Sequence, residues 1–264
     1  MRESSPEEAR DELSLNSRKI HTDHYVVGCR KDGLCWLLPA VEGDLADDQD
    51  IEAAQRFSSL TEAISASTKL EANVFELILD SYGRATLTEL LVDLDKIQSV
   101  PYEGCYWLMD GLLVGSNPIA FDPNVTAQRT EGLHRAGVRR VVSLLSRDEL
   151  FAFCEEDDDK WLEEFEHHVF PIRDGGVPTA ATMRLILNVI DQSVARNEVV
   201  FVHCWGGRGR TGLAAACFVA RHGVAVGQAA LNLIARKRFE VGLFAPAPET
   251  KVQLEFARNW KEGD

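Results

Sequence analysis

The sequence predicts an α/β fold with a mainly parallel central sheet and helices on both faces, preceded by a small N-terminal α+β region. Strand-like apolar runs alternate with helical patterns between residues 138 and 221, which is the order found in parallel sheets. The run Val199–Val202 contains only β-branched and aromatic residues and is typical of a strand buried on both faces. A glycine-rich loop then joins this strand to an Ala-rich helix, so the loop lies at the carboxyl edge of a central strand, where open α/β sheets bind ligands.

The chain has 264 residues, enough for one large domain or two small ones at about 150 residues per domain. Its net charge of −14 and its pI of about 5.0 argue against nucleic acid and anionic membranes as partners, because both require a basic face. The acidic balance leaves room for a phosphorylated substrate, which needs only a local positive pocket.

The compartment is expected to be cytoplasmic. The N-terminal segment MRESSPEEARDELS is charged and lacks the apolar core of a signal peptide, and no apolar run approaches the length of a membrane span. The six cysteines form no C-x-x-C pair and no Cys/His spacing suited to zinc. We therefore expect no integral membrane segment, no metal and no cofactor.

The first hundred residues carry no chemical motif. The segment His24–Leu38 predicts a β-hairpin around Asp32–Gly33, and residues 51–67 have helical spacing. Residues 71–79 fit a strand or a helix, and residues 87–97 have leucines at helical spacing. His21, Asp23 and His24 suggest a metal only weakly, since no further ligands accompany them.

The elements expected after residue 100 alternate regularly. They are a hairpin over 106–114, a helix over 126–135, a strand over 138–145, a strand over 167–171, a helix from Thr179 to Val194, the strand at 199–202, the helix from Leu213, a helix over 226–238 and a last helix over 252–260.

The candidate functional site is the segment EVVFVHCWGGRGRTG, Glu198 to Gly212. The three glycines of its loop, Gly206, Gly207 and Gly209, can turn backbone N–H groups inward, and the following helix presents its positive end to the same point. Arg210 supplies a planar fork that matches two phosphate oxygens. Cys204, in that field, ionises easily and becomes a nucleophile. The segment therefore predicts a loop that holds a phosphate and directs a thiolate at its phosphorus.

The pattern His203-Cys204, five residues, Arg210-Thr211-Gly212 resembles the signature loop of the cysteine-dependent protein tyrosine and dual-specificity phosphatases. We call His203–Gly212 the signature loop. The resemblance runs from about Tyr102 to Trp260 and implies a phosphatase-like catalytic domain over 101–264, with a region of unknown role over 1–100. It also implies that Thr211 helps to stabilise the departing thiolate.

The expected mechanism passes through a phosphocysteine on Cys204. Arg210 and the backbone N–H groups of the loop bind the phosphate oxygens, and His203 orients the loop. We expect the general acid to be Asp174, in the glycine-rich segment Ile172–Pro178, which we call the acid loop. The residues expected to contact the phosphate are Trp205, Gly206, Gly207, Arg208 and Gly209.

Several assignments rank lower. Asp191 lies on a helix, and Asp157–Asp159 belong to a carboxylate run that is typical of a solvated face. Gln253 resembles a glutamine that positions water in some members of the family, but an exposed helix glutamine is the preferred interpretation.

The substrate is left open at this point. The signature loop favours phosphotyrosine or mixed phosphoproteins, whereas Arg208, as a second cation, would suit an inositol phosphate or a phosphoinositide. A non-catalytic phosphate-binding module is disfavoured because the cysteine, the arginine and the acid are all present. Sulfur transfer is disfavoured by the Arg-Thr-Gly sequence and by the separate Asp174 loop.

Overall fold

A computed structural model describes most of the chain after residue 92 and part of the chain before it. The described residues are 24–31, 34–37, 63, 73–79, 85–91, 93–150 and 164–264. The fold contains two compact units, and the chain passes from one to the other between Val92 and Asp93. The charged N-terminal segment MRESSPEEARDELS, the carboxylate run that contains Asp157–Asp159 and, apart from Ala63, the segment over 51–67 with helical spacing lie outside the described residues.

The N-terminal unit contains a four-stranded antiparallel sheet in the order β2-β1-β3-β4. Its strands are β1 (His24–Lys31), β2 (Leu34–Leu37), β3 (Asn73–Leu79) and β4 (Ala85–Glu89). The predicted hairpin is confirmed, and the segment that fits a strand or a helix forms a strand over 73–79. The helical leucine spacing over 87–97 does not produce one helix, because pairing with β3 extends β4 to Glu89 and the helix begins at Leu94.

The short helix α3 (Leu94–Ser99) belongs to the C-terminal unit, although it precedes residue 101. Asp93 caps its first turn, and Lys96 Nζ donates to Glu240 at 2.7 Å. Trp107 Nε1 donates to the carbonyl of Ser99 at 3.2 Å. These bonds attach α3 to elements that lie after residue 100.

The C-terminal unit is built on a five-stranded sheet in the order β5-β6-β9-β7-β8. Only β5 and β6 pair antiparallel, so the predicted mainly parallel sheet is confirmed. The strands are β5 (Cys105–Met109), β6 (Leu112–Gly115), β7 (Val138–Ser143), β8 (Glu166–Val169) and β9 (Val199–His203). Because β9 lies between β6 and β7, both of its edges are paired and the loop after it is held on either side.

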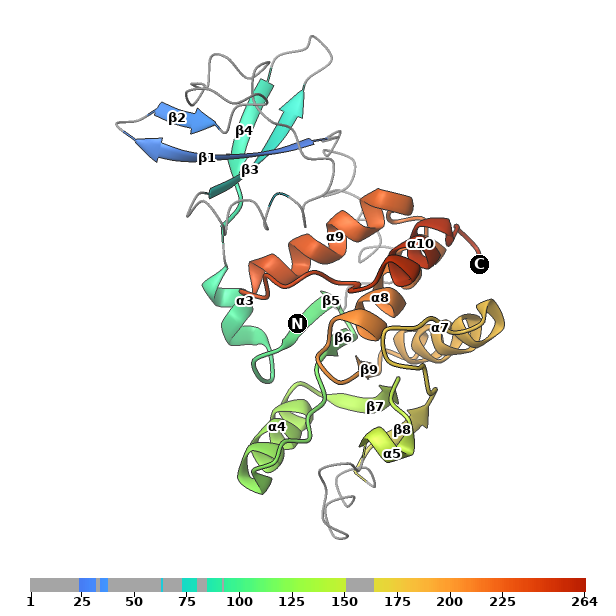
Figure 1. The fold of residues 1–264 in the computed structure, drawn as a ribbon. Coiled ribbons are helices and arrows are strands. Elements are labelled where there is room, and N and C mark those ends of the chain that lie inside the picture. The colour runs from blue at the N-terminus through green and yellow to red at the C-terminus, as the bar shows by residue number, and fades with distance from the viewer. Residues whose placement is uncertain are drawn as a thin grey trace. The chain divides into compact units, whose positions relative to one another are not determined.

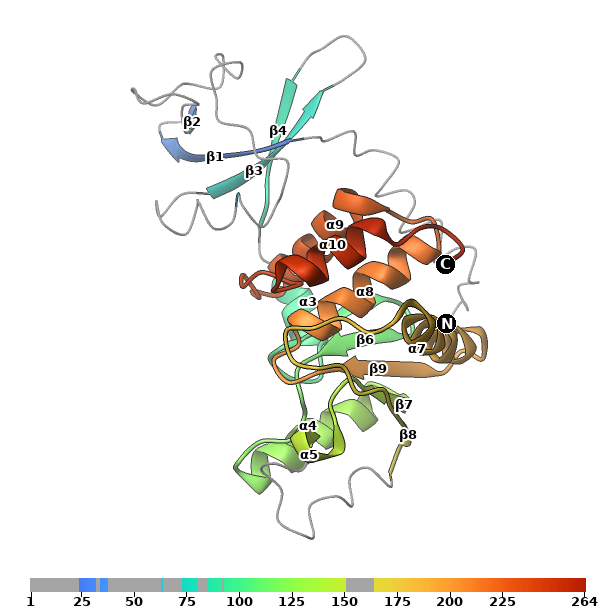
Figure 2. The same ribbon diagram turned by 45° about the vertical axis from the view of Figure 1, so that its right-hand side comes forward.

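Helices cover both faces of this sheet, as predicted (Figures 1 and 2). The helix α4 lies on one face and α7, α8, α9 and α10 lie on the other. Their bounds are α4 (Pro123–Arg135), α7 (Ala180–Ala195), α8 (Gly209–Arg221), α9 (Gly227–Glu240) and α10 (Lys251–Asn259), and a short α5 (Arg147–Leu150) follows β7.

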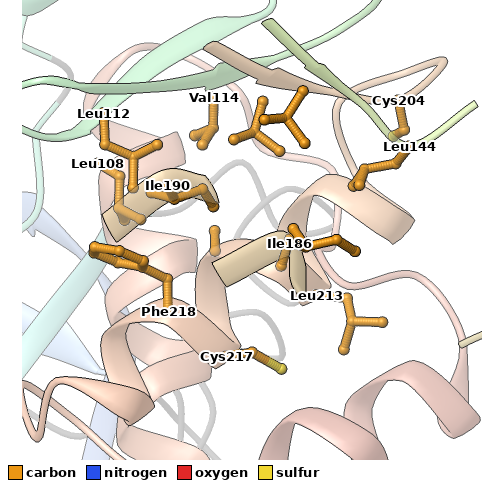
Figure 3. Close-up of a cluster of buried hydrophobic side chains, with 14 of the residues drawn as sticks. Leu108, Leu112, Val114, Leu144, Ile186, Ile190, Cys204, Leu213, Cys217 and Phe218 are labelled. Atoms are coloured by element: carbon orange, nitrogen blue, oxygen red, sulfur yellow. The ribbon is translucent and has the colours of Figure 1, made fainter. Parts of the chain in front are cut away.

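The central helix α8 is buried over its whole length from Gly209 to Ala220. Its glycines and alanines allow neighbouring elements to approach closely: a Cβ on Gly212 would meet that of Ala247 at 3.0 Å. The buried cluster in Figure 3 includes side chains of α8, α7 and the sheet. Cys204 lies at the opposite end of this cluster from Leu108 and Phe218, where the strands end.

Candidate active site

Cys204 follows directly after β9, and α8 begins five residues later at Gly209. The sheet pairing continues up to this point, since the N–H of Leu144 donates to the carbonyl of His203 at 2.9 Å. The Cys204 residue is only 3% exposed. The signature loop therefore starts from a rigid strand end and returns into a buried helix, which fixes both of its ends.

Two other thiols of this unit, Cys105 and Cys217, are buried in the hydrophobic core. Burial raises the pKa of Cys105 to about 12, and burial also raises the pKa of Cys217 well above its usual value. Both remain protonated at neutral pH and contribute apolar packing.

The signature loop packs against the residues that follow β6. The N–H of Asn117 donates to the carbonyl of Trp205 at 2.9 Å. Gly207 has a φ of +64°, and a Cβ there would lie 2.5 Å from the carbonyl carbon of Gly115. Thr211 Oγ1 donates to the carbonyl of Gly115 at 3.3 Å, so in this structure its hydroxyl proton is directed to the sheet.

A buried arginine from α9 supports the same loop. Arg238 is 3% exposed, and its Nη1 donates to the carbonyl of Gly207 at 2.9 Å. Its Nη2 donates to the carbonyl of Ala245 at 3.4 Å, and the guanidinium lies 5.8 Å from the ring centroid of Tyr106. Arg238 thus holds a carbonyl of the signature loop from α9, and sequence analysis missed it.

His203 is fully buried, and its ring stacks on Phe201 with the centroids 5.4 Å apart. Burial, with smaller contributions from His167 and Arg210, lowers the pKa of His203 to about 3, so the ring is neutral at neutral pH. Its Nδ1 lies 3.3 Å from the carbonyl oxygen of Cys204 and must donate, because a carbonyl only accepts. This contact agrees with an orienting role for His203 and with no role as a base.

Arg210 collects three oxygen partners although it is only 2% exposed. Its Nη1 donates to Glu149 at 2.8 Å and to the carbonyl of Ile172 at 3.0 Å, and its Nη2 pairs with Asp174 at 3.0 Å. The Asp174 side chain is 82% exposed. The structure therefore brings the predicted phosphate-binding arginine and the predicted acid into direct contact.

Glu149 is the fixed partner of Arg210. It lies in α5, just after β7, and also accepts from the N–H of Ser146 at 2.9 Å. Partial burial raises the pKa of Glu149, but the hydrogen bonds from Ser146 and Arg210 outweigh burial and leave the pKa below its usual value. A negative Glu149 holds the guanidinium in one orientation, and sequence analysis missed this residue as well.

The acid loop is held by the N-terminal turn of α10. Thr250 Oγ1 donates to the carbonyl of Gly175 at 2.8 Å, and Gln253 Nε2 donates to the carbonyl of Gly176 at 3.0 Å. Gly175 has a φ of +67°, which a residue with a side chain adopts only under strain. Asp174 is thus exposed on a loop whose next two carbonyls are anchored.

Gln253 corrects an expectation from the sequence. It is fully buried, whereas the sequence favours an exposed helix glutamine. Its Oε1 accepts from the N–H groups of Glu249 and Thr250 at 3.2 Å, and a Cβ on Gly209 would meet Oε1 at 3.0 Å. Gln253 therefore lies between the acid loop and the signature loop.

Arg208 is turned toward the segment before α10. Its Nε donates to the carbonyl of Pro246 at 3.3 Å, and its Nη2 pairs with Glu249 at 3.2 Å. The other oxygen of Glu249 accepts from the N–H of Gly209 at 3.1 Å. Trp205 is 42% exposed on the same loop. The predicted role of residues 205–209 in binding phosphate stays a prediction.

One of the residues that sequence analysis missed, Glu149, could have been found from topology. Parallel strands end at one edge of a sheet, so residues after β7 must approach the loop after β9, and Glu149 lies there. Arg238 and Glu249 are far from Cys204 in the sequence, and no local pattern indicates them.

Among the described residues, no group of three or more His, Cys, Asp or Glu side chains is arranged to hold a metal ion. No helix within the described ranges has the length and apolar character required to cross a membrane.

A cysteine at the end of a central parallel strand, a glycine-rich loop and an arginine at the start of the next helix are the arrangement of the tyrosine and dual-specificity phosphatases. A family model described as "Swiss Army Knife protein, DSP-PTPase phosphatase domain" matches residues 104–260, which is more than half of the chain. The chain therefore belongs to this family.

Similar proteins share shorter stretches. Cyclin-dependent kinase inhibitor 3 of Sus scrofa is 31% identical over 94 residues, which cover 34% of this chain and 43% of that protein. The protein MJ0215 of Methanocaldococcus jannaschii is 35% identical over 71 residues, which cover 25% of this chain and 45% of that protein. The chain thus spans less than half of the length of the curated relatives it matches.

Solved structures are similar at low identity. The crystal structure of Tk-PTP in its active form is 23% identical, covers 59% of this chain and 94% of that chain, and has a TM-score of 0.48. Kinase-associated phosphatase with its catalytic cysteine replaced by serine is 21% identical, covers 58% of this chain and 90% of that chain, and also has a TM-score of 0.48.

Proposed function

We propose that this chain is a metal-independent phosphatase that hydrolyses phosphate monoesters of proteins, phosphotyrosine first and phosphoserine or phosphothreonine as further substrates. The observation that carries the proposal is the convergence on Arg210. The guanidinium of Arg210, in the signature loop, is oriented by Glu149, and its Nη2 lies 3.0 Å from Asp174. A phosphate oxyanion would replace Asp174 at Nη2 and leave Glu149 in place.

In the first step, the Cys204 thiolate attacks phosphorus and an S–P bond forms while the ester P–O bond breaks. Asp174, in its protonated form, gives its proton to the leaving oxygen. The loop N–H groups and Arg210 stabilise the charge on the three equatorial oxygens. Phosphocysteine and a free alcohol or phenol result.

In the second step, water attacks the phosphorus of phosphocysteine. Asp174, now a carboxylate, takes a proton from that water as the new P–O bond forms. The S–P bond breaks, the electron pair returns to Cys204 as thiolate, and inorganic phosphate leaves. Asp174 is protonated again, so the cycle closes without a cofactor.

The test compares two cysteines of this unit. Cys204→Ser should abolish hydrolysis of p-nitrophenyl phosphate and retain binding of inorganic phosphate, measured by calorimetry. Cys217→Ala removes a buried thiol of α8 and should retain turnover, because that sulfur contributes packing only. Full activity of Cys204→Ser would overturn the proposal.

A further inference from the structure

The two arginines of the signature loop have different surroundings. The Arg210 side chain is buried, whereas the Arg208 side chain is 37% exposed and is turned toward Pro246 and Glu249. The second cation of the loop, which could receive a second phosphate, therefore already has a partner.

That partner is a bridging carboxylate. One oxygen of Glu249 pairs with Arg208 Nη2 at 3.2 Å, and the other accepts from the N–H of Gly209 at 3.1 Å. Gly209 is the first residue of α8, so Glu249 lies at the positive end of that helix. The neighbouring residues Thr250 and Gln253 fix the start of α10 through a capping box, which holds Glu249 at this position.

A negative charge at this position would repel a second negative group on a bound substrate. A phosphate seated on the cysteine loop is held mainly by Arg210 and by the loop N–H groups. A second phosphate on an adjacent atom of the substrate would need Arg208, and it would face the carboxylate that now pairs with it. The carboxylate and the second phosphate are both negative and would repel each other. A repulsive group of this kind often determines which substrate a site accepts.

We propose that Glu249 is a specificity-determining residue that favours substrates with a single phosphate and disfavours those with two phosphates on neighbouring atoms, such as inositol bisphosphates. This inference rests on the proposed phosphatase function and names its substrate class. It also assigns Arg208 a role in specificity that appears only when Glu249 is neutral.

The experiment measures the ratio of kcat/KM for an inositol bisphosphate with adjacent phosphates to kcat/KM for p-nitrophenyl phosphate. Glu249→Gln keeps an oxygen for the N–H of Gly209 and removes the charge, and it should raise this ratio by about fivefold to tenfold. Glu255→Gln removes the same charge from an exposed position of α10 and should leave the ratio unchanged. Adding Arg208→Met to Glu249→Gln should return the ratio to that of the wild type.

Binding gives an independent measurement. In proteins that carry Cys204→Ser, calorimetry with inorganic phosphate and with the same inositol bisphosphate should show the same change in affinity ratio. This arm separates the two proposals: absent turnover in the wild type would contradict the phosphatase function, while the affinity ratio would still test Glu249. The specificity role is overturned by an unchanged ratio in Glu249→Gln, by an equal rise in Glu255→Gln, or by a rise that persists without Arg208.

Discussion

The signature loop and the acid loop meet at Arg210 but are held in opposite ways. Buried contacts hold the signature loop. Asn117 donates to one of its carbonyls, Gly115 packs against it, and the buried Arg238 donates to another of its carbonyls. The acid loop exposes 82% of the Asp174 side chain and is anchored through backbone carbonyls by side chains of a distant helix.

The difference indicates which part of the site can move. Displacing the signature loop requires breaking buried backbone packing, whereas the acid loop depends on a few side-chain hydrogen bonds, each with a net worth of about 1 kcal/mol. Segments with few buried contacts are the ones that open locally, and acid loops need such freedom to admit substrate. Perturbing the signature loop should therefore affect folding and all turnover, and perturbing the acid loop should affect proton transfer selectively.

The largest effect is expected for Gly207→Ala. A Cβ there would meet Gly115 and Ser116 backbone atoms at 2.5 and 2.6 Å, in a left-handed conformation with a φ of +64°. The loop must shift away from the sheet, so we expect a loss of kcat/KM of about 10²-fold or more and a fall in the free energy of unfolding of about 2–4 kcal/mol.

Gly206→Ala is the matched control for that change. A Cβ at Gly206 would meet no protein atom within 4 Å, so the free energy of unfolding should stay near that of the wild type. Urea unfolding measures the free energy of unfolding of both variants, and assays with p-nitrophenyl phosphate measure kcat/KM of Gly207→Ala. An equal loss of stability at the two glycines would show that close packing against β6 does not hold the loop.

The second effect is expected for Arg238→Met, which keeps the apolar stem and removes the hydrogen bond to the carbonyl of Gly207. The buried carbonyl then lacks this donor, so the free energy of unfolding should fall by about 2–3 kcal/mol and turnover should fall with it. Arg135→Met, at a side chain that is 72% exposed, should change stability by less than about 0.5 kcal/mol. If Arg238→Met were as stable and as active as the wild type, Arg238 would not be needed to hold the signature loop.

The third effect concerns pH. The pKa of His203 is about 3 in the fold against an ordinary value of 6.5, so the unfolded chain binds a proton at pH 5 that the folded chain does not. This lowered pKa makes stability fall as pH falls below 6.5, by about 2 kcal/mol between pH 7 and pH 5. In His203→Asn that part of the pH dependence should disappear, as measured by urea unfolding at both pH values. An identical loss in both proteins would assign it to other groups.

Sequence patterns predicted what local chemistry determines. The cysteine loop, its strand and its helix follow from the residues at 198–212, because glycine, β-branched and small residues each suit one local conformation. The parallel sheet follows from the alternation of strand-like apolar runs with helical patterns along the chain. In the segment over 87–97, helical leucine spacing is overridden up to Glu89, where a strand partner, β3, is available.

Contacts between distant segments could not be predicted in this way. Gln253 has the polarity of a surface residue, and only the packing of α10 against both loops explains its burial. Glu149, Arg238 and Glu249 reach the site from α5, α9 and the segment before α10, and no local pattern connects them to Cys204. Those contacts decide how the two loops are held, although the reacting groups themselves were apparent from the sequence.

The smallest effect is expected for Thr250→Val, which tests the acid loop alone. The substitution preserves side-chain shape and removes the hydroxyl that donates to the carbonyl of Gly175 at 2.8 Å. Gln253 and Arg210 still hold the loop, so Asp174 should be positioned less well and not lost. We expect kcat for phenyl phosphate, which needs a proton on its leaving oxygen, to fall about fivefold, and kcat for p-nitrophenyl phosphate, a better leaving group, to change less. Thr250→Ser keeps the hydroxyl and should restore both rates.

Because Thr250 also caps α10, loss of its hydroxyl costs about 1 kcal/mol of stability. A purely structural effect would lower both rates equally, and that outcome would mean that the loop does not depend on this anchor for proton transfer.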